Sequence, residues 1–114
     1  MTKKDFFELC KKEYVYLDGA TGSNLQEKGL IAGECPETWI LEHPQELIDL
    51  QRAYVEAGTN ILYAPTFTAN RIKLAEYGLA DRLEEINSKL VAPAFCARGR
   101  SSYLSHTRFQ PSAV

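Results

Sequence analysis

The amino-acid sequence predicts an α/β fold, because a helix, a strand and a second helix follow one another in the middle of the chain. Apolar residues within 46–57 recur at helical spacing, and Gly58 directly after them suits the left-handed turn that closes a helix. Residues 59–64 then contain a continuous apolar run rather than an alternating one, which indicates a strand buried on both faces of a parallel sheet. A second amphipathic stretch opens at Asn70.

The helix predicted over 46–57 has one apolar side, with which it is expected to cover another layer of the fold. The apolar stripe contains Leu47, Leu50, Tyr54 and Ala57, and the polar side contains Glu46, Asp49, Gln51, Arg52 and Glu56. Pro65 is expected to end the strand, since proline cannot donate to a sheet. The polar residues Thr66, Thr68 and Asn70 thus follow the carboxyl end of a parallel strand, where α/β folds place their binding sites.

The N-terminal segment supplies a second set of candidates. Residues 2–12 are predicted to form a covering helix capped by Thr2 and Asp5, with no functional role of its own. Residues 14–17 are rich in β-formers and are predicted as the first strand, which leads into Asp18.

Asp18 begins a tight loop over 18–24 that contains two glycines. Gly19 would let a ligand approach the backbone, so that backbone N–H groups bind a carboxylate while Asp18 binds an ammonium group. Phosphate binding has weak support, because neither common glycine-rich nucleotide motif is present. The alternative is an aspartate that closes a turn by bonding to the backbone two residues further on.

The other segments are less informative. A short helix is predicted over 25–30, an irregular connection over 34–37, and an amphipathic helix over 81–91 that packs on the sheet. Pro93 is expected to break that last helix. The segment 92–114 follows neither the helical nor the strand period, and is predicted to be an atypical, poorly ordered tail.

Composition narrows the class of protein. The 114 residues are 45% hydrophobic and 25% charged, as in one small globular domain. A formal net charge of -2 provides no basic field for nucleic acid. The sequence contains no apolar segment long enough for a signal peptide or membrane span, so a cytoplasmic location is expected.

The cysteines predict neither a disulfide framework nor a metal site. Cys10, Cys35 and Cys96 are odd in number and far apart, which favours a reducing compartment. Cys35 and His43 form a lone pair with a spacing that zinc sites do not use.

Three sequence segments occur in a fixed order. They are Leu-Asp-Gly-Ala-Thr-Gly at 17–22, Ala-Tyr-Val-Glu-Ala-Gly-Thr-Asn-Ile at 53–61, and the stretch 65–79 that begins Pro-Thr-Phe-Thr-Ala-Asn-Arg. Together they resemble the N-terminal part of homocysteine S-methyltransferase domains. The likeness extends over about residues 14–91. It is greatest to the homocysteine-binding module of cobalamin-dependent methionine synthases, with betaine-homocysteine methyltransferases as more distant relatives.

The resemblance implies a TIM (β/α)8 barrel, of which residues 14–18 and 60–66 would be the first two of eight strands. A barrel of this type needs about 250 residues, so the fold expected here is an incomplete N-terminal portion over residues 1–91. Its open sheet edge predicts poor stability or self-association. The tail over 92–114 departs from the family pattern and suggests a truncated or frame-altered gene product.

The family's chemistry implies roles for five residues of this chain. Asp18 would bind the ammonium of homocysteine, Gly19 would lie against the amino-acid backbone, and Thr66, Phe67 and Asn70 would line the pocket. The family uses zinc to activate the homocysteine thiol for attack on a methyl donor, and methylcobalamin held by another domain is one possible donor. The zinc-binding cysteines of the family have no counterpart here, so neither a metal ligand nor a catalytic residue is assigned.

The leading hypothesis is therefore an N-terminal fragment of a homocysteine S-methyltransferase that carries part of the homocysteine site and is inactive alone. Its expected partners are homocysteine and the missing barrel remainder or the cobalamin and folate domains. The alternative is a non-catalytic small α/β module that self-associates or binds a partner through its uncovered sheet edge.

Overall fold

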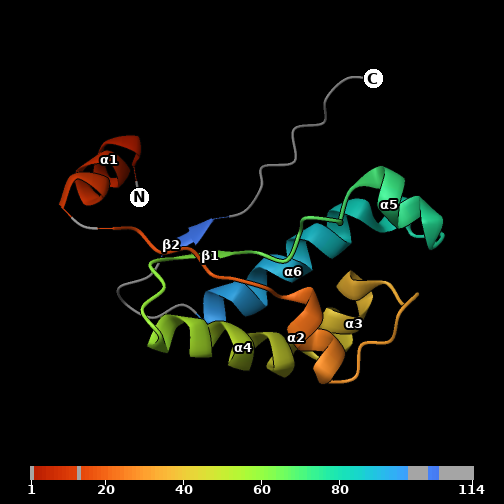
Figure 1. Cartoon of the computed structure of the whole chain (residues 1–114). Helices are drawn as coiled ribbons and strands as arrows, with labels where there is room; N and C mark the ends of the chain where they lie inside the picture. The colour runs from red at the N-terminus through yellow and green to blue at the C-terminus, as the bar shows by residue number, and fades with distance from the viewer. Residues whose placement is uncertain (1, 13, 98–102, 106–114) are drawn as a thin grey trace.

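The computed structural model describes residues 2–12, 14–97 and 103–105. They form helices around a short two-stranded parallel sheet (Figure 1). In chain order the elements are α1 Lys3–Lys12, α2 Gly22–Glu27, α3 Pro36–Glu42, α4 Pro44–Glu56, β1 Ile61–Tyr63, α5 Arg71–Glu76, the 3-10 helix η1 Ala80–Arg82, α6 Leu83–Ala97 and β2 Tyr103–Ser105.

The central helix, strand and helix predicted from the sequence are present as α4, β1 and α5. Pro44 occupies the first turn of α4, and Gly58 follows the helix with a φ of 111°. The Asn70 side chain caps α5 by accepting from the Lys73 amide at 3.0 Å. The local signals at the ends of these helices were therefore read correctly.

The first predicted strand is reduced to a single parallel bridge between Leu17 and Ile61. The Tyr16 carbonyl accepts from the amides of Asn60 and Ile61, and the Asp18 amide donates to the Ile61 carbonyl at 3.2 Å. The segment 14–18 therefore lies parallel to β1, as predicted, but the prediction of a strand over 14–17 was wrong. Tyr16 and Leu17 are largely exposed, so little packing flattens this segment into a strand.

Three further predictions are corrected. α2 begins at Gly22, so the loop after Asp18 is shorter than 18–24. α3 begins at Pro36, which suits a first helical turn because proline lacks an amide donor, so residues 36 and 37 are helical rather than irregular. α6 continues through Pro93 to Ala97, and Pro93 itself is buried, which offsets its missing hydrogen bond.

The segment predicted as a poorly ordered tail contains β2, which pairs in parallel with β1 and aligns Ile61 with Tyr103. The apolar run at this strand is only a few residues long, so the sequence carries no strand signal there. Residues 98–102 and 106–114, on which the rest of that prediction depends, lie outside the described residues.

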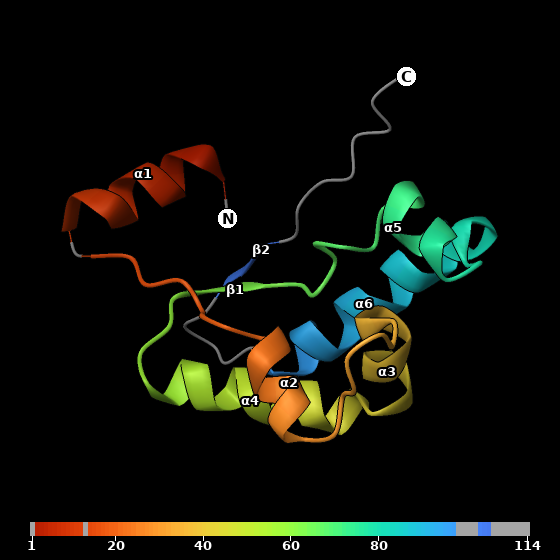
Figure 2. The same cartoon turned by 45° about the vertical axis from the view of Figure 1, so that its right-hand side comes forward.

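The hydrophobic core lies among the helices below the strands (Figure 2). α4 and α6 pack along one another, and α3 packs against both. The fully buried members of the core come from α2, α4, α5 and α6: Leu25, Leu47, Leu74, Ile86 and Leu90. By contrast, α1 has no buried residue and stands apart from this body in both views.

Thr2 and Asp5 cap α1 as predicted. The Thr2 amide donates to the Asp5 carboxylate at 2.8 Å, and the Asp5 amide donates to the Thr2 hydroxyl at 3.1 Å. Within the part of the chain that the structure describes, no helix has both the length and the apolar character needed to cross a membrane.

Candidate functional site

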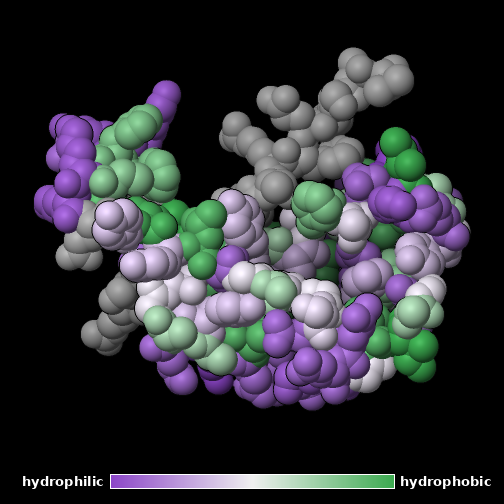
Figure 3. Space-filling model, in the orientation of Figure 1, coloured by the Kyte–Doolittle hydropathy of each residue, from purple (hydrophilic) through white to green (hydrophobic). Residues whose placement is uncertain are grey.

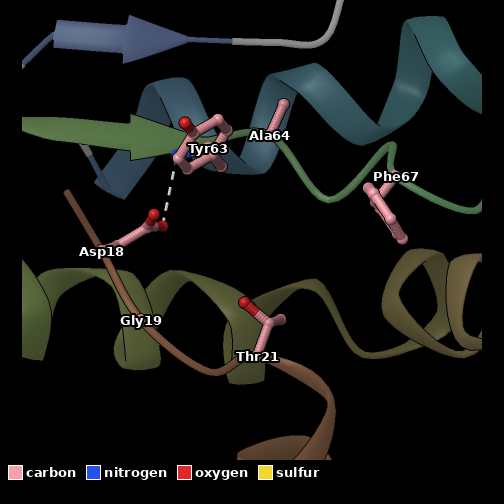
Figure 4. Close-up of a pocket in the computed structure, with 6 residues that line it drawn as sticks. All are labelled: Asp18, Gly19, Thr21, Tyr63, Ala64 and Phe67. Atoms are coloured by element: carbon pink, nitrogen blue, oxygen red, sulfur yellow. Dashed lines mark hydrogen bonds between the residues drawn. The ribbon is translucent and has the colours of Figure 1, made fainter.

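A pocket of about 460 Å³ opens where β1 ends and the segment after Leu17 passes beneath it. Its lining brings together two regions distant in the sequence (Figure 4): Asp18, Gly19, Thr21, Tyr63, Ala64 and Phe67. The polar groups and the aromatic side chains thus converge at the carboxyl end of a parallel strand, where ligands bind in α/β folds.

The Asp18 carboxylate points from the lower segment toward the end of β1 (Figure 4). Its Oδ2 accepts from the Tyr63 amide at 3.2 Å. Partial burial raises the pKa of Asp18, while hydrogen bonds from the Tyr63 amide, its own amide and the Gln51 side chain act in the opposite direction. Since its acceptor bond crosses to β1, the carboxylate does more than close a local turn.

Gly19 is in contact with α4. A Cβ at this position would lie 2.9 Å from the Tyr54 hydroxyl oxygen, and that hydroxyl donates to the Ala20 carbonyl at 2.9 Å. The absence of a side chain at Gly19 therefore makes room for Tyr54. This packing role stands beside the predicted role in ligand approach.

The three other predicted site residues lie at different depths. Phe67 lines the pocket and is 85% exposed, so its ring is available to a ligand or a partner. Thr66 is buried, with 8% of its surface exposed. The Asn70 side-chain oxygen is engaged as the cap of α5, so this residue holds the loop rather than lining the pocket.

Sequence reasoning missed Gln51, which it placed on the polar side of the first amphipathic helix. The structure buries Gln51 to 1% exposure, and its Nε2 donates to the Tyr63 carbonyl at 2.8 Å. The signal was present, because position 51 lies one helical turn after Leu47 and three residues before Tyr54, on the same face. Tyr63 was read only as a strand residue, although its side chain emerges at the strand's end.

A second polar cluster holds the loop after β1 from below. The Glu37 carboxylate of α3 is 3% exposed; it accepts from the Thr68 hydroxyl and from the Cys35 thiol, whose Sγ lies 3.3 Å away. Burial raises the pKa of the Cys35 thiol, and the adjacent Glu37 raises it further. Glu37 therefore anchors the loop that carries Thr66 and Phe67.

These residues do not fit a zinc site. Among the described residues, no group of three His, Cys, Asp or Glu side chains could hold a metal ion. A cysteine ligand to zinc must be a thiolate, whereas the Cys35 thiol donates to Glu37 and burial raises its pKa. Cys10 is exposed on α1, away from the pocket.

Comparison with known proteins decides the family. The sequence model described as homocysteine S-methyltransferase matches residues 15–109, which include every residue of the pocket. This chain belongs to the homocysteine S-methyltransferase family.

Two mycobacterial relatives agree with that family. The methionine synthase of Mycobacterium tuberculosis is 29% identical over 96 residues, which cover 79% of this chain and 8% of the relative. The methionine synthase of Mycobacterium leprae is 28% identical over 91 residues, which cover 75% of this chain and 8% of the relative. The chain thus spans less than a tenth of the length of either protein.

Proposed function

We propose that this chain carries part of the homocysteine site of a methionine synthase-type methyltransferase. The observation that carries the proposal is the convergence of Asp18, Gly19 and Phe67 on one pocket in a chain of this family. Homocysteine has an ammonium group, a carboxylate and a thiol, and the pocket offers a carboxylate, backbone and an aromatic ring. Asp18 binds the ammonium, and the backbone near Gly19 lies against the amino-acid carboxylate.

The proposed barrel is incomplete. The parallel arrangement of the 14–18 segment, β1 and β2 supports an assignment of these segments to one side of a (β/α)8 barrel, with α4 and α6 as covering helices. The remaining strands would come from a longer protein of this family, together with the zinc site and a cobalamin-bound methyl donor. Alone, the chain binds homocysteine weakly and does not transfer a methyl group.

The binding claim is tested with the 114-residue chain and its Asp18→Asn variant. Asparagine keeps the shape but turns an ion pair into a neutral hydrogen bond, a loss of about 1.5–3 kcal/mol, or roughly 10- to 150-fold in affinity. Calorimetric titration with homocysteine measures this loss. The matched control ligand is 4-mercaptobutyrate, which lacks the amino group and whose binding is expected to change little in the variant.

The pH dependence of binding provides a separate check. Because the ammonium binds the ionised carboxylate, affinity is expected to fall as pH drops through the raised pKa of Asp18. Equal affinity of both variants for homocysteine at every pH would refute the role of Asp18. Methionine formation by the pure chain, with zinc and a methyl donor added, would refute the claim that it is inactive alone.

A non-catalytic module that self-associates is the second candidate. Its support is a set of exposed apolar side chains on α1 and the segment after it: Phe6, Phe7, Tyr14, Tyr16 and Leu17. Figure 3 shows hydrophobic side chains gathered on the side of α1 that faces the rest of the molecule. A monomer in gel filtration with a cooperative thermal transition would argue against this second candidate, whereas homocysteine binding that is weakened in Asp18→Asn would favour the first.

A further inference from the structure

Gln51 occupies a position where an apolar side chain would be expected. It lies on the core side of α4, is 1% exposed, and has a buried Oε1 with no hydrogen-bond partner among the described residues. An unpaired buried acceptor is unfavourable, and leucine or methionine would fill the same volume without that cost. Packing therefore does not explain an amide side chain at this position, whereas the hydrogen bond that its Nε2 donates does.

That donor connects Gln51 to the backbone of Tyr63. Nε2 donates to the Tyr63 carbonyl at 2.8 Å, and the Tyr63 amide donates to Asp18 Oδ2 at 3.2 Å. The last residue of β1 is thus held through both of its backbone polar groups, by one residue from α4 and one from the lower segment. A shift of Tyr63 would move the donor that Asp18 uses.

We propose that Gln51 is a positioning residue for Asp18, which it holds at the edge of the pocket through the backbone of Tyr63. This inference rests on the proposed function, because it gives Gln51 a role in the recognition of an amino-acid ammonium group. Gln51 has no contact with the ligand in this arrangement. Gln51 acts by fixing the direction of the Asp18 carboxylate and the number of hydrogen-bond donors that face it.

The electrostatics agree with this arrangement. The Gln51 side chain is one of three hydrogen-bond donors that lower the pKa of Asp18 against the larger effect of burial. The other titratable groups nearby are Tyr63 at the end of β1 and Tyr54 of α4. Among the described residues, no charged side chain contributes to the pKa of Asp18, so the loss of one neutral donor is expected to be visible.

The test uses Gln51→Leu in the 114-residue chain, with the carboxyl carbon of Asp18 followed by NMR during a pH titration. Loss of the amide donor is expected to move the pKa of Asp18 upward and to weaken homocysteine binding about three- to tenfold. The matched control is Gln45→Leu on the same helix, because the Gln45 amide bonds to Asp49 and not to Asp18. That control is expected to leave the Asp18 titration unchanged.

A measurement on the unaltered chain covers the case in which Gln51→Leu fails to fold. The side-chain amide resonances of Gln51 are expected to shift with the same midpoint as the Asp18 carboxyl. A Gln51 signal that ignores the Asp18 titration, or an Asp18 pKa unchanged in a folded Gln51→Leu variant, would overturn the inference. Absence of homocysteine binding by the parent chain would instead refute the proposed function, and the NMR titration would still report on Gln51.

Discussion

The helical body and the strand end of this molecule are built on different principles. The body contains Leu25, Leu47, Ile86 and Leu90, each 1% exposed or less, and its helices cover one another. At the strand end, Leu17 is 49% and Tyr63 is 42% exposed, and a single bridge replaces the first predicted strand. The body is stabilised by packing. At the strand end Leu62 and Ala64 are buried as well, but the exposed Tyr63 between them is held by hydrogen bonds to two polar side chains.

The difference shows how the candidate site depends on the core. Gln51 and Glu37 project from the body, from α4 and α3, and each holds backbone or side-chain groups of the β1 region. A binding site on a weakly packed edge needs such supports, because otherwise its side chains would not keep a fixed geometry.

Leu47→Ala and Leu17→Ala compare the two regions directly. Leu47 is fully buried, so its truncation removes packing and leaves a cavity, at a cost of about 2–5 kcal/mol in the free energy of unfolding. Leu17 is half exposed, and its truncation is expected to cost about 1 kcal/mol or less. Denaturant unfolding of both variants measures the two costs. Equal costs would mean that the strand end is part of the core.

Thr68→Val removes one of the two donors to the buried Glu37 carboxylate. A buried charge that loses a donor is expensive, and we expect a loss of about 1–3 kcal/mol in the free energy of unfolding. Thr38→Val is the matched control, since the Thr38 hydroxyl donates at 3.1 Å to the neutral Cys35 carbonyl. Its expected cost is about 0.5–1.5 kcal/mol. A loss in Thr68→Val no larger than that in the control would show that the bond from Thr68 to Glu37 does not hold the loop.

The sequence predicted the body better than the strand end. Periodic apolar residues and Gly58 marked α4, and Asn70 marked the start of α5, because these signals act within one or two helical turns. The tail strand β2 and the lost strand at 14–17 depend on which distant segments pair, and no local pattern fixes that choice.

The candidate site divides in the same way. Asp18, Gly19 and Phe67 were found from their place after the expected strands and from the family resemblance, and the structure brings them to one pocket. Gln51 and the Glu37 cluster were missed, because charged and amide side chains are ordinarily assigned to the surface. Buried polar residues of this kind are recognised only when the backbone groups that they bind are in view.

Gly19→Ala tests the contact between the pocket segment and α4. The added Cβ would displace the Tyr54 hydroxyl and its bond to Ala20, at an expected cost of about 1 kcal/mol. In a Tyr54→Phe background the hydroxyl is already absent, so the same substitution is expected to cost less. A double-mutant cycle from denaturant unfolding measures this coupling. If the costs of Gly19→Ala and Tyr54→Phe are additive, the strain caused by the added Cβ does not come from its contact with Tyr54.

Among these substitutions, Asp18→Asn is expected to change the free energy of unfolding least, and to raise it rather than lower it. The folded-state pKa of Asp18 is raised, so the folded chain binds more protons than the unfolded one between the ordinary and the raised values. The free energy of unfolding therefore falls as pH rises through that window. Asparagine does not titrate, so this fall is absent in the variant, and its side-chain oxygen can still accept from the Tyr63 amide. The variant is therefore expected to gain less than about 1 kcal/mol in the free energy of unfolding at neutral pH.

Asp5→Asn is the matched comparison, because bonds from Thr2 lower the pKa of Asp5. The stability that the Asp5 carboxylate contributes to α1 is fully present at pH values above its unfolded-state pKa. It is lost as the pH falls through the lowered folded-state pKa. α1 has no buried residue, so the effect is read locally, as a loss of α1 helicity by NMR at neutral pH. If the two substitutions change stability in opposite directions, Asp18 is a site residue that lowers the stability of the fold, whereas Asp5 is a helix cap that raises it. A loss of stability in Asp18→Asn would mean that its charge serves the fold instead of a ligand.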